Sequence, residues 1–421
     1  MVLSIVIVFI IGYIFIAFEH FVKVDKAASA LIMGVVCWAL FAILTPTTNS
    51  EVEGKLLHSM SEIAGILFFL LGAMTIVELI DSHEGFDIIT NSITTTSKQK
   101  LLWIIGGITF FLSAILDNLT TAIVMMSMCS KLLQSQKDRW RFGGLIIINA
   151  NAGGAFSPLG DVTTTMLWVG KQITASNIIV KLLVPSLVCA LVPMLIFHFL
   201  YKNQKLIPKQ KTSKSITTLP DRKLIFYSGV VLLLLVPVFK MVTHLPPFMG
   251  ILLALGIMWV ITTFVHHHKQ IELQKKLSVV SALQRIDAPS ILFFLGILLA
   301  VSALQATGVL QQTATYLTTH LHSTTNIATA LGALSAVIDN VPLVAATQGM
   351  YSLQEYPTNH QFWELIALTT GTGGSMIIIG SAAGVAVMGI QNIPFGWYIK
   401  NISWIAAIGF ILGIATFLCL Q

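Results

Sequence analysis

Residues 149–165 read NANAGGAFSPLGDVTTT, and they lie within a longer apolar run that covers residues 143–170. Proline removes a backbone donor and clashes with the preceding helical turn, while glycine tolerates unusual dihedral angles, so a helix passing through this stretch should break. Unwound backbone is tolerated within a bilayer only where it lines a cavity in the protein. The stretch therefore predicts a broken membrane helix with a polar binding site at the break.

The composition around this stretch is that of a polytopic membrane protein. Of the 421 residues, 55% are hydrophobic and only 10% are charged, whereas soluble domains carry roughly 25% charged residues. Apolar runs of about twenty residues recur along the chain, and this is the length of helix that crosses a ~30 Å hydrocarbon core. These features exclude soluble enzymes and nucleic-acid binders. The expected partner is the lipid bilayer, and we expect neither nucleic acid nor a soluble protein as a partner.

The runs lie near residues 2–18, 27–45, 61–80, 101–133, 143–170, 179–200, 224–242, 248–265, 289–307, 324–350, 361–390 and 402–420. Ten of them cross the membrane if the runs at 101–133 and 324–350 are re-entrant hairpins, although a tight pair of spans at either place would satisfy the loop charges equally. The basic residues then fall on the inner side except Lys55, Lys171, Lys181 and Lys240. Because inner loops are enriched in Lys and Arg, both termini should lie outside.

An internal repeat relates the two parts of the chain. Residues 113–118, SAILDN, match residues 335–340, SAVIDN, at a shift of 222 positions. Nearly the same shift places FFL at 68–70 over FFL at 293–295, and Gly153, Gly154 and Gly160 over Gly373, Gly374 and Gly380. Membrane helices reuse small residues, so chance repetition is the alternative, but several landmarks that share one offset argue against it.

We therefore predict an all-α polytopic membrane protein built from two inverted repeats, residues 1–201 and 224–421, joined by a cytoplasmic linker at 202–223. Each repeat should contain five spans and one re-entrant hairpin, and one of the five spans should be a helix broken at the midplane, at 143–170 and 361–390. An odd number of crossings turns the second repeat upside down. Inverted repeats with a midplane site are typical of secondary transporters.

Three acidic residues, Asp117, Asp161 and Asp339, lie deep in apolar runs. A carboxylate at that depth costs several kcal/mol unless it meets a cation, a proton or water, so such residues are functional by default. The alternative is an aspartate that only caps a helix or bonds a neighbouring hydroxyl. Asp117 and Asp339 each precede an asparagine, a pair that favours turns and helix N-caps, and they should form the two hairpin tips. Oxygen ligands without thiolate or imidazole suit a hard cation such as Na⁺ or Li⁺.

The second broken stretch, residues 369–384, reads TTGTGGSMIIIGSAAG and has Ser381 where Asp161 stands in the first. The charge is therefore asymmetric between the repeats. The strings GAFSPLGDVTTTMLW at 154–168 and SAILDNLTT at 113–121 closely resemble the NhaD-type sodium/proton antiporters. These belong to an ion-transporter superfamily that also contains arsenite pumps and dicarboxylate carriers.

The resemblance implies exchange of Na⁺ or Li⁺ for H⁺, a scaffold domain and a transport domain, a homodimer, and a location in the bacterial inner (plasma) membrane, with no cofactor besides the transported ions. Carried over to this chain, the cation and proton site comprises Asp117, Asn118, Ser157, Asp161, Thr163, Thr164, Asp339, Asn340 and Ser381. Sodium should be held by Asp117, Asp161, Asn118 and Thr163. Further candidates are Asn149, Asn151, Thr120, Thr370 and Glu78, the last in a possible pH-sensing funnel or simply at a solvated helix end.

The proposed chemistry is competition at one site. Burial and a like charge both favour the neutral forms of Asp117 and Asp161, so either a proton or a sodium ion relieves the repulsion, but not both together. Dicarboxylate carriers have Ser-Asn-Thr at the hairpin tip, and the aspartates found here disfavour a dianion. A carrier for arsenite or an organic anion, and an ion channel, are the rival interpretations. An enzyme is disfavoured because the predicted spans contain neither a His-Glu metal motif nor a nucleophile with a partnered base.

Overall fold

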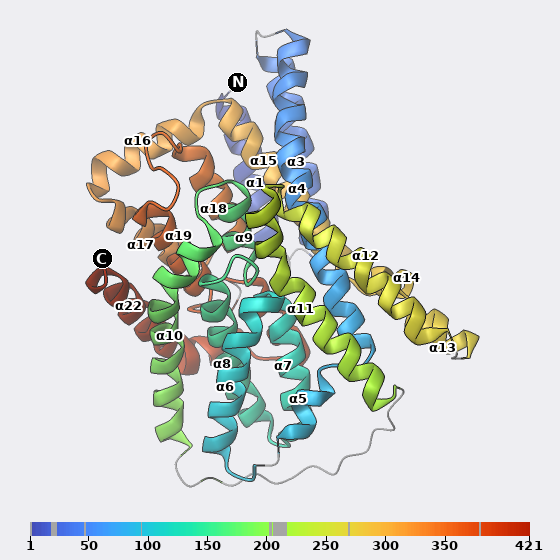
Figure 1. The fold of residues 1–421 in the computed structure, drawn as a ribbon. Helices are drawn as coiled ribbons and strands as arrows, with labels where there is room; N and C mark the ends of the chain where they lie inside the picture. The colour runs from blue at the N-terminus through green and yellow to red at the C-terminus, as the bar shows by residue number, and fades with distance from the viewer. Residues whose placement is uncertain are drawn as a thin grey trace.

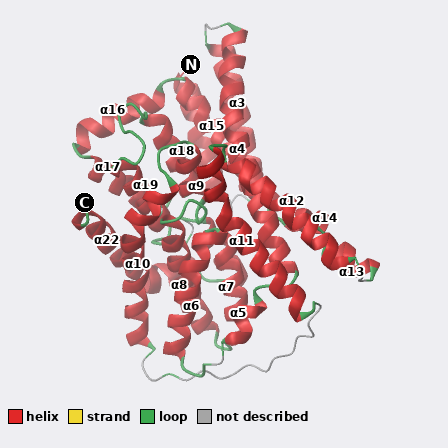
Figure 2. Cartoon of the chain, viewed as in Figure 1, coloured by secondary structure: helices red, strands yellow, loops and turns green. Residues whose placement is uncertain are grey.

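The structure is a computed structural model that describes residues 2–17, 23–45, 48–93, 95–201, 204, 217–267, 270–378 and 380–421. Within these residues every regular element is a helix (Figure 2). The helices long and apolar enough to cross a membrane are α3 (Lys26–Leu44), α4 (Asn49–Ser82), α6 (Lys98–Leu116), α10 (Ala175–Leu200), α11 (Leu219–Thr243), α12 (Pro247–His266), α15 (Ala288–Ala306) and the continuous segment Phe395–Cys419. The prediction of a polytopic α-helical membrane protein is confirmed.

Shorter helices complete the described part of the chain. They are α1 (Val2–Ala17), α5 (Asp87–Ser92), α7 (Asn118–Leu132), α8 (Gln136–Ala155), α9 (Val162–Val169), α13 (Ile271–Lys276), α14 (Val279–Arg285), α16 (Val309–Leu321), α17 (Thr324–Leu334), α18 (Asn340–Met350), α19 (Gln361–Gly373) and α20 (Ala382–Gln391). The continuous segment Phe395–Cys419 consists of α21 (Phe395–Tyr398), the π-helix Ile399–Ser403 and α22 (Trp404–Cys419). Most of the predicted linker at 202–223 lies outside the described residues.

The two predicted hairpins are helix pairs. In the run 101–133 the chain reverses at Asp117, which ends α6 and begins α7. In the run 324–350, α17 and α18 are separated by residues 335–339. Figure 1 shows α6 and α7 side by side in the lower half of the molecule, whereas α17 and α18 lie in the upper half.

Both predicted helix breaks are present. The run 143–170 divides into α8 and α9, and the run 361–390 divides into α19 and α20. Pro158 lies within the first break, where Ser157, Leu159 and Gly160 also leave helical geometry. Each second half-helix starts at a side chain that caps it, Asp161 for α9 and Ser381 for α20.

Equivalent glycines make equivalent close contacts in the two parts of the chain. A Cβ atom added to Gly153 would lie 2.0 Å from the carbonyl oxygen of Phe110, and one added to Gly373 would lie 2.0 Å from that of Gly332. The Ser113 hydroxyl donates to the Ala150 carbonyl at 2.6 Å, and the equivalent Ser335 hydroxyl donates to the Thr370 carbonyl at 2.7 Å. These contacts agree with the predicted repeat, while its inverted orientation and its boundaries stay predictions.

Several elements differ from the sequence-based expectation, among them the short helices α5, α13 and α14, which lie outside the predicted apolar runs. Helix α4 begins at Asn49 and not near residue 61, because Thr48 caps a polar extension that places Glu51 in its first turn. Helix α16 was not expected, because its threonine-rich sequence has no long apolar run. Gly308, with a φ of 79°, separates α16 from α15.

The helices pack in two groups, each drawn from both parts of the chain. Helices α1, α3, α4, α11, α12 and α15 form one group, and α6–α10 with α17–α22 form the other. Within the first group α3 and α15 cross closely, because a Cβ atom added to Gly34 would lie 2.6 Å from the carbonyl oxygen of Gly296. Helices α4 and α15 face α9 and α18 across the boundary between the groups.

Candidate cation site

A small cavity lies at this boundary, and Asp117, Asp161 and Asp339 all line it. Leu70 of α4 and Phe294 of α15 form part of the opposite wall. The cavity measures about 30 Å³, which is room for a water molecule or a small cation but not for an organic substrate. Among the described residues, no lysine, arginine or histidine contributes to its lining.

Helix N-termini converge on this cavity. Asp117 accepts a hydrogen bond from the Thr120 N–H at 2.9 Å and caps α7, and Asp161 accepts one from the Thr163 N–H at 2.9 Å and caps α9. Asp339 accepts from the Val341 N–H at 3.3 Å and caps α18. Helix N-termini carry partial positive charge, which stabilises a carboxylate placed there. All three aspartates therefore cap helices, and the capped ends also meet at one cavity.

Asp161 is held by neutral donors from three elements. One of its oxygens accepts hydrogen bonds from the Thr163 N–H and hydroxyl, both at 2.9 Å. The other accepts from the amide of Asn118 at 2.7 Å and from that of Asn340 at 3.2 Å. Both hairpin tips therefore meet the first helix break at this one carboxylate, which is only 1% exposed.

Asn151 connects this carboxylate to the second helix break. Its side-chain oxygen accepts from the Asn118 amide at 3.0 Å, and its own amide donates to the hydroxyls of Ser375 at 2.9 Å and Ser381 at 3.0 Å. The sequence suggested Asn151 only as a minor candidate, yet its side chain joins the two broken helices.

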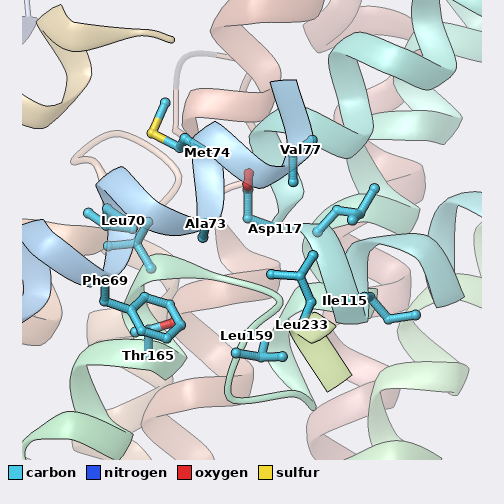
Figure 3. A pocket seen from close by; sticks show the side chains of 12 residues that line it. Phe69, Leu70, Ala73, Met74, Val77, Ile115, Asp117, Leu159, Thr165 and Leu233 are labelled. Carbon is cyan, nitrogen blue, oxygen red and sulfur yellow. The ribbon is translucent and has the colours of Figure 1, made fainter. Parts of the chain in front are cut away.

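Asp117 lies between the first cavity and a second one of about 20 Å³. Figure 3 shows its carboxylate among apolar side chains of α4, including Met74 and Val77. Both carboxylate oxygens accept hydrogen bonds from Thr120, the second from the hydroxyl at 2.8 Å. The backbone of Asp117 has φ 80° and ψ 159°, a region that is essentially restricted to glycine. Residues held in such a conformation cluster at functional sites.

Asp339 differs from the other two aspartates because a cation lies near it. Lys26 is a charged neighbour of this carboxylate, and its Nζ lies 4.8 Å from the centroid of the Phe293 ring. No group of three or more acidic, histidine or cysteine side chains within metal-binding reach occurs among the described residues. A cation in the cavity would therefore bind to one or two carboxylates together with neutral oxygens.

Four other predicted site residues donate to nearby backbone carbonyls and do not hydrogen-bond to Asp161. The side chains of Ser157, Thr164, Asn149 and Thr370 donate to the carbonyls of Ala114, Gly154, Leu145 and Ile366 at 2.5, 3.5, 2.8 and 2.6 Å. Glu78 forms an ion pair with Arg285, with 3.1 Å between its oxygen and the Arg285 Nε, so it connects α4 to α14. The helix-end interpretation of Glu78 describes this contact better than a funnel does.

Sequence reasoning missed two features. Leu70 and Phe294 line the cavity, and the repeated FFL at 68–70 and 293–295 was the signal that could have assigned them to it. Buried His83 and His266 face each other with 2.8 Å between their Nε2 atoms, joining the ends of α4 and α12. No sequence signal connects these histidines, which lie 183 positions apart.

Comparison with known proteins places this architecture in a family. The citrate transporter family matches residues 13–371. "Sodium/proton antiporter 2" of Arabidopsis thaliana is 44% identical over 98% of both chains, and "Sodium/proton antiporter 1" of the same plant is 46% identical over 98% of this chain and 71% of its own length. The "Na(+)/H(+) antiporter NhaD" of Alkalimonas amylolytica is 30% identical over 98% of this chain and 89% of its own. The chain belongs to the NhaD-type sodium/proton antiporter family.

The resemblance seen in the sequence is thus confirmed, and a solved structure supports the fold of this NhaD-type chain. The YdaH transporter of Alcanivorax borkumensis superposes with a TM-score of 0.59, covering 94% of this chain and 98% of its own, at 12% identity. At that identity the likeness concerns the fold alone. Membership of the family, together with the long apolar helices, shows that the chain is an integral membrane transporter.

Proposed function

We propose that this NhaD-type protein exchanges Na⁺ or Li⁺ for H⁺ by alternating access, with the cation and the proton competing for Asp161. The single observation that carries the proposal is the surroundings of this carboxylate. It is buried at a cavity of about 30 Å³, and its hydrogen-bond donors are the neutral groups of Thr163, Asn118 and Asn340.

Competition follows from charge balance. Neutral donors orient the Asp161 carboxylate without neutralising it, so the buried negative charge favours binding of a proton or a cation. One monovalent cation is enough to balance one carboxylate, which makes the two occupants mutually exclusive. Asp117 lines the same cavity and is the second candidate ligand, whereas Asp339 already has Lys26 as a charged neighbour.

The name of the matching family raises citrate as a rival substrate. The cavity disfavours citrate on two grounds. It is too small for citrate, and its carboxylates would repel an anion because none of its described lining residues is cationic. A channel is also disfavoured, because the relatives are named as antiporters.

The deciding experiment measures cation-induced dissipation of a pH gradient in everted vesicles with Na⁺, Li⁺ and K⁺ at several pH values. We expect exchange with Na⁺ or Li⁺ and its loss in Asp161→Asn. Asn149→Ala, on the same broken helix but bonded only to a backbone carbonyl, is the matched control and should retain exchange. Wild-type exchange in Asp161→Asn, or uptake of radiolabelled citrate without proton exchange, would overturn the proposal.

We further propose a homodimer in a bacterial plasma membrane with both termini outside. Because the relatives come from a plant as well as from bacteria, they do not decide which membrane holds this chain. The bacterial plasma membrane is therefore proposed from the sequence resemblance alone. Helices α11 and α12 are the least buried candidate spans of the described residues, and a partner or lipid must cover them. Light scattering in detergent tests the proposal, since a monomeric mass would refute the dimer.

A further inference from the structure

A larger hollow of about 260 Å³, here called the outer vestibule, lies among α4, α9, α15 and α18. Its polar lining includes Glu62 of α4, Ser302 and Gln305 of α15, Gln348 of α18 and Gln172 beyond the end of α9. Lys55 and Lys171, which the loop charges place outside, belong to the same ends of α4 and α9. The vestibule is therefore predicted to face the outer side.

The vestibule and the cation cavity are lined by the same four helices, one turn apart. The vestibule is bordered by Ile66 of α4, Met166 of α9, Leu298 of α15 and Ala345 of α18. The cavity is bordered by Leu70, Val162, Phe294 and Val341 of the same helices. On every helix the two residues are four positions apart, a rise of about 6 Å. All eight side chains are apolar.

We propose that the outer vestibule is the outer access route of the transported cation, and that these two apolar layers are its closed gate. The inference rests on the proposed exchange function. A hydrated cation would enter past Glu62 and the amide side chains. Apolar layers offer no ligands to replace the water molecules of the ion, so the ion cannot pass until the layers separate.

Hydrogen bonds indicate which side of the gate moves. The Gln348 amide donates to the Met166 carbonyl at 3.1 Å and to the Gln172 side-chain oxygen at 2.8 Å, which joins the outer end of α9 to α18. At their inner ends the same helices are joined by the contact between Asn340 and Asp161. Helices α9 and α18 are thus connected at both ends and can move as one unit that carries the cation ligands.

The opposite side of the gate is anchored elsewhere. The Trp38 side chain of α3 donates to the Leu299 carbonyl at 3.0 Å and to the Ser302 hydroxyl at 3.1 Å. Because α15 is held to α3 in this way, we assign the movement that separates the layers to the α9–α18 unit.

Thiol accessibility tests the route without requiring transport. Cys37, Cys129 and Cys189 are buried, so Cys419→Ser provides a background without an exposed thiol among the described cysteines. Ser302→Cys then places a thiol in the vestibule, and Ser290→Cys places one in the cation cavity on the same helix. Ala303→Cys is the control, since Ala303 is buried outside both linings.

We expect a membrane-impermeant cationic methanethiosulfonate, added to right-side-out vesicles, to modify Ser302→Cys about tenfold faster than Ala303→Cys and Ser290→Cys, as counted by mass spectrometry. Inside-out vesicles should show no such preference for Ser302→Cys. Equal rates for the three variants from outside, or modification of Ser302→Cys only from inside, would overturn the route. Modification is counted even in a variant that exchanges nothing, so this outcome is independent of the proposed exchange.

A charge variant tests whether Glu62 attracts the cation. Glu62→Gln should raise the KM for Na⁺ supplied from the vestibule side about two- to threefold at low ionic strength and leave kcat unchanged, and added salt should remove the difference. Glu53→Gln removes the same charge from the exposed start of α4, outside the vestibule lining, and should change neither constant. An unchanged KM in Glu62→Gln, or an equal change in Glu53→Gln, would refute attraction by Glu62.

Discussion

At the scale of the residue, the site combines buried charge with neutral donors. The sequence could predict Asp117, Asp161 and Asp339, because a carboxylate in an apolar run is conspicuous, and the repeated Asp-Asn pairs pointed to Asn118 and Asn340. It could not separate Thr163, which bonds to Asp161, from Thr164, which bonds to a backbone carbonyl. Neighbouring side chains on a helix point in different directions, and only the packing decides which of them faces the cavity.

Asn118→Ala tests the donors to Asp161. The substitution removes the 2.7 Å hydrogen bond to the carboxylate, and a bond to a charged group contributes about 1.5–3 kcal/mol. The charged carboxylate, which is the form that binds sodium, is then less stable relative to its protonated form. We expect the KM for Na⁺ to rise about tenfold at neutral pH, and the rise to shrink at higher pH where fewer protons compete.

The measurement is the initial rate of exchange against Na⁺ concentration at several pH values. Asn149→Ala is the matched control, because the Asn149 amide donates only to the Leu145 carbonyl. A KM that is unchanged in Asn118→Ala at every pH would show that this hydrogen bond does not influence sodium binding.

Asp117→Gly separates the chemistry of Asp117 from its backbone strain. A non-glycine residue with φ 80° and ψ 159° costs about 1–3 kcal/mol, whereas replacing an N-cap aspartate by glycine costs only a few tenths. The variant should therefore melt no lower than the wild type while its exchange activity falls. Asp339→Gly is the contrast, because Asp339 has a φ of −48° and gains no relief of strain. A lower melting temperature in Asp117→Gly than in Asp339→Gly would contradict the argument.

At the scale of the element, proline and glycine made the helix breaks predictable, and the Asp-Asn pairs made the hairpins predictable. The bounds of α4 and the existence of α16 were not predictable in this way, because polar residues can form helix outside the apolar core. Nor could the sequence show that α9 and α18 are joined at both ends, since Gln348 and Met166 are 182 positions apart.

Gly153→Ala tests the close contact between the hairpin and the broken helix. The added Cβ would lie 2.0 Å from the Phe110 carbonyl oxygen, so α6 and α8 must separate, at a cost of about 1–3 kcal/mol. We expect a clearly lower melting temperature in detergent, and a similar loss for Gly373→Ala at the equivalent contact with Gly332. Gly107→Ala on α6 meets no atom within 4 Å and should melt at or above the wild-type temperature. Equal melting temperatures for all three variants would show that these close contacts do not contribute to stability.

At the scale of the whole molecule, the repeat predicted two related parts, but the packing crosses between them. Helix α3 from the first part packs on α15 from the second, and Asp161 receives donors from both hairpins. Apolar surfaces of membrane helices are chemically alike, so the hydrophobic pattern of the sequence cannot identify which helices pack together. The close crossing of α3 and α15 at Gly34 and Gly296 becomes visible only in three dimensions.

Cys419 makes the predicted orientation of the whole molecule directly measurable. It is exposed near the end of α22, whereas Cys37, Cys129 and Cys189 are buried, so an impermeant maleimide should label Cys419 alone in the native protein. The loop charges place Lys400 inside and the end of α22 outside. We therefore expect full labelling in intact cells and none after Cys419→Ser. Labelling only in inverted vesicles would reverse the orientation of every span, because all the spans are fixed relative to α22, and would place the vestibule on the inner side.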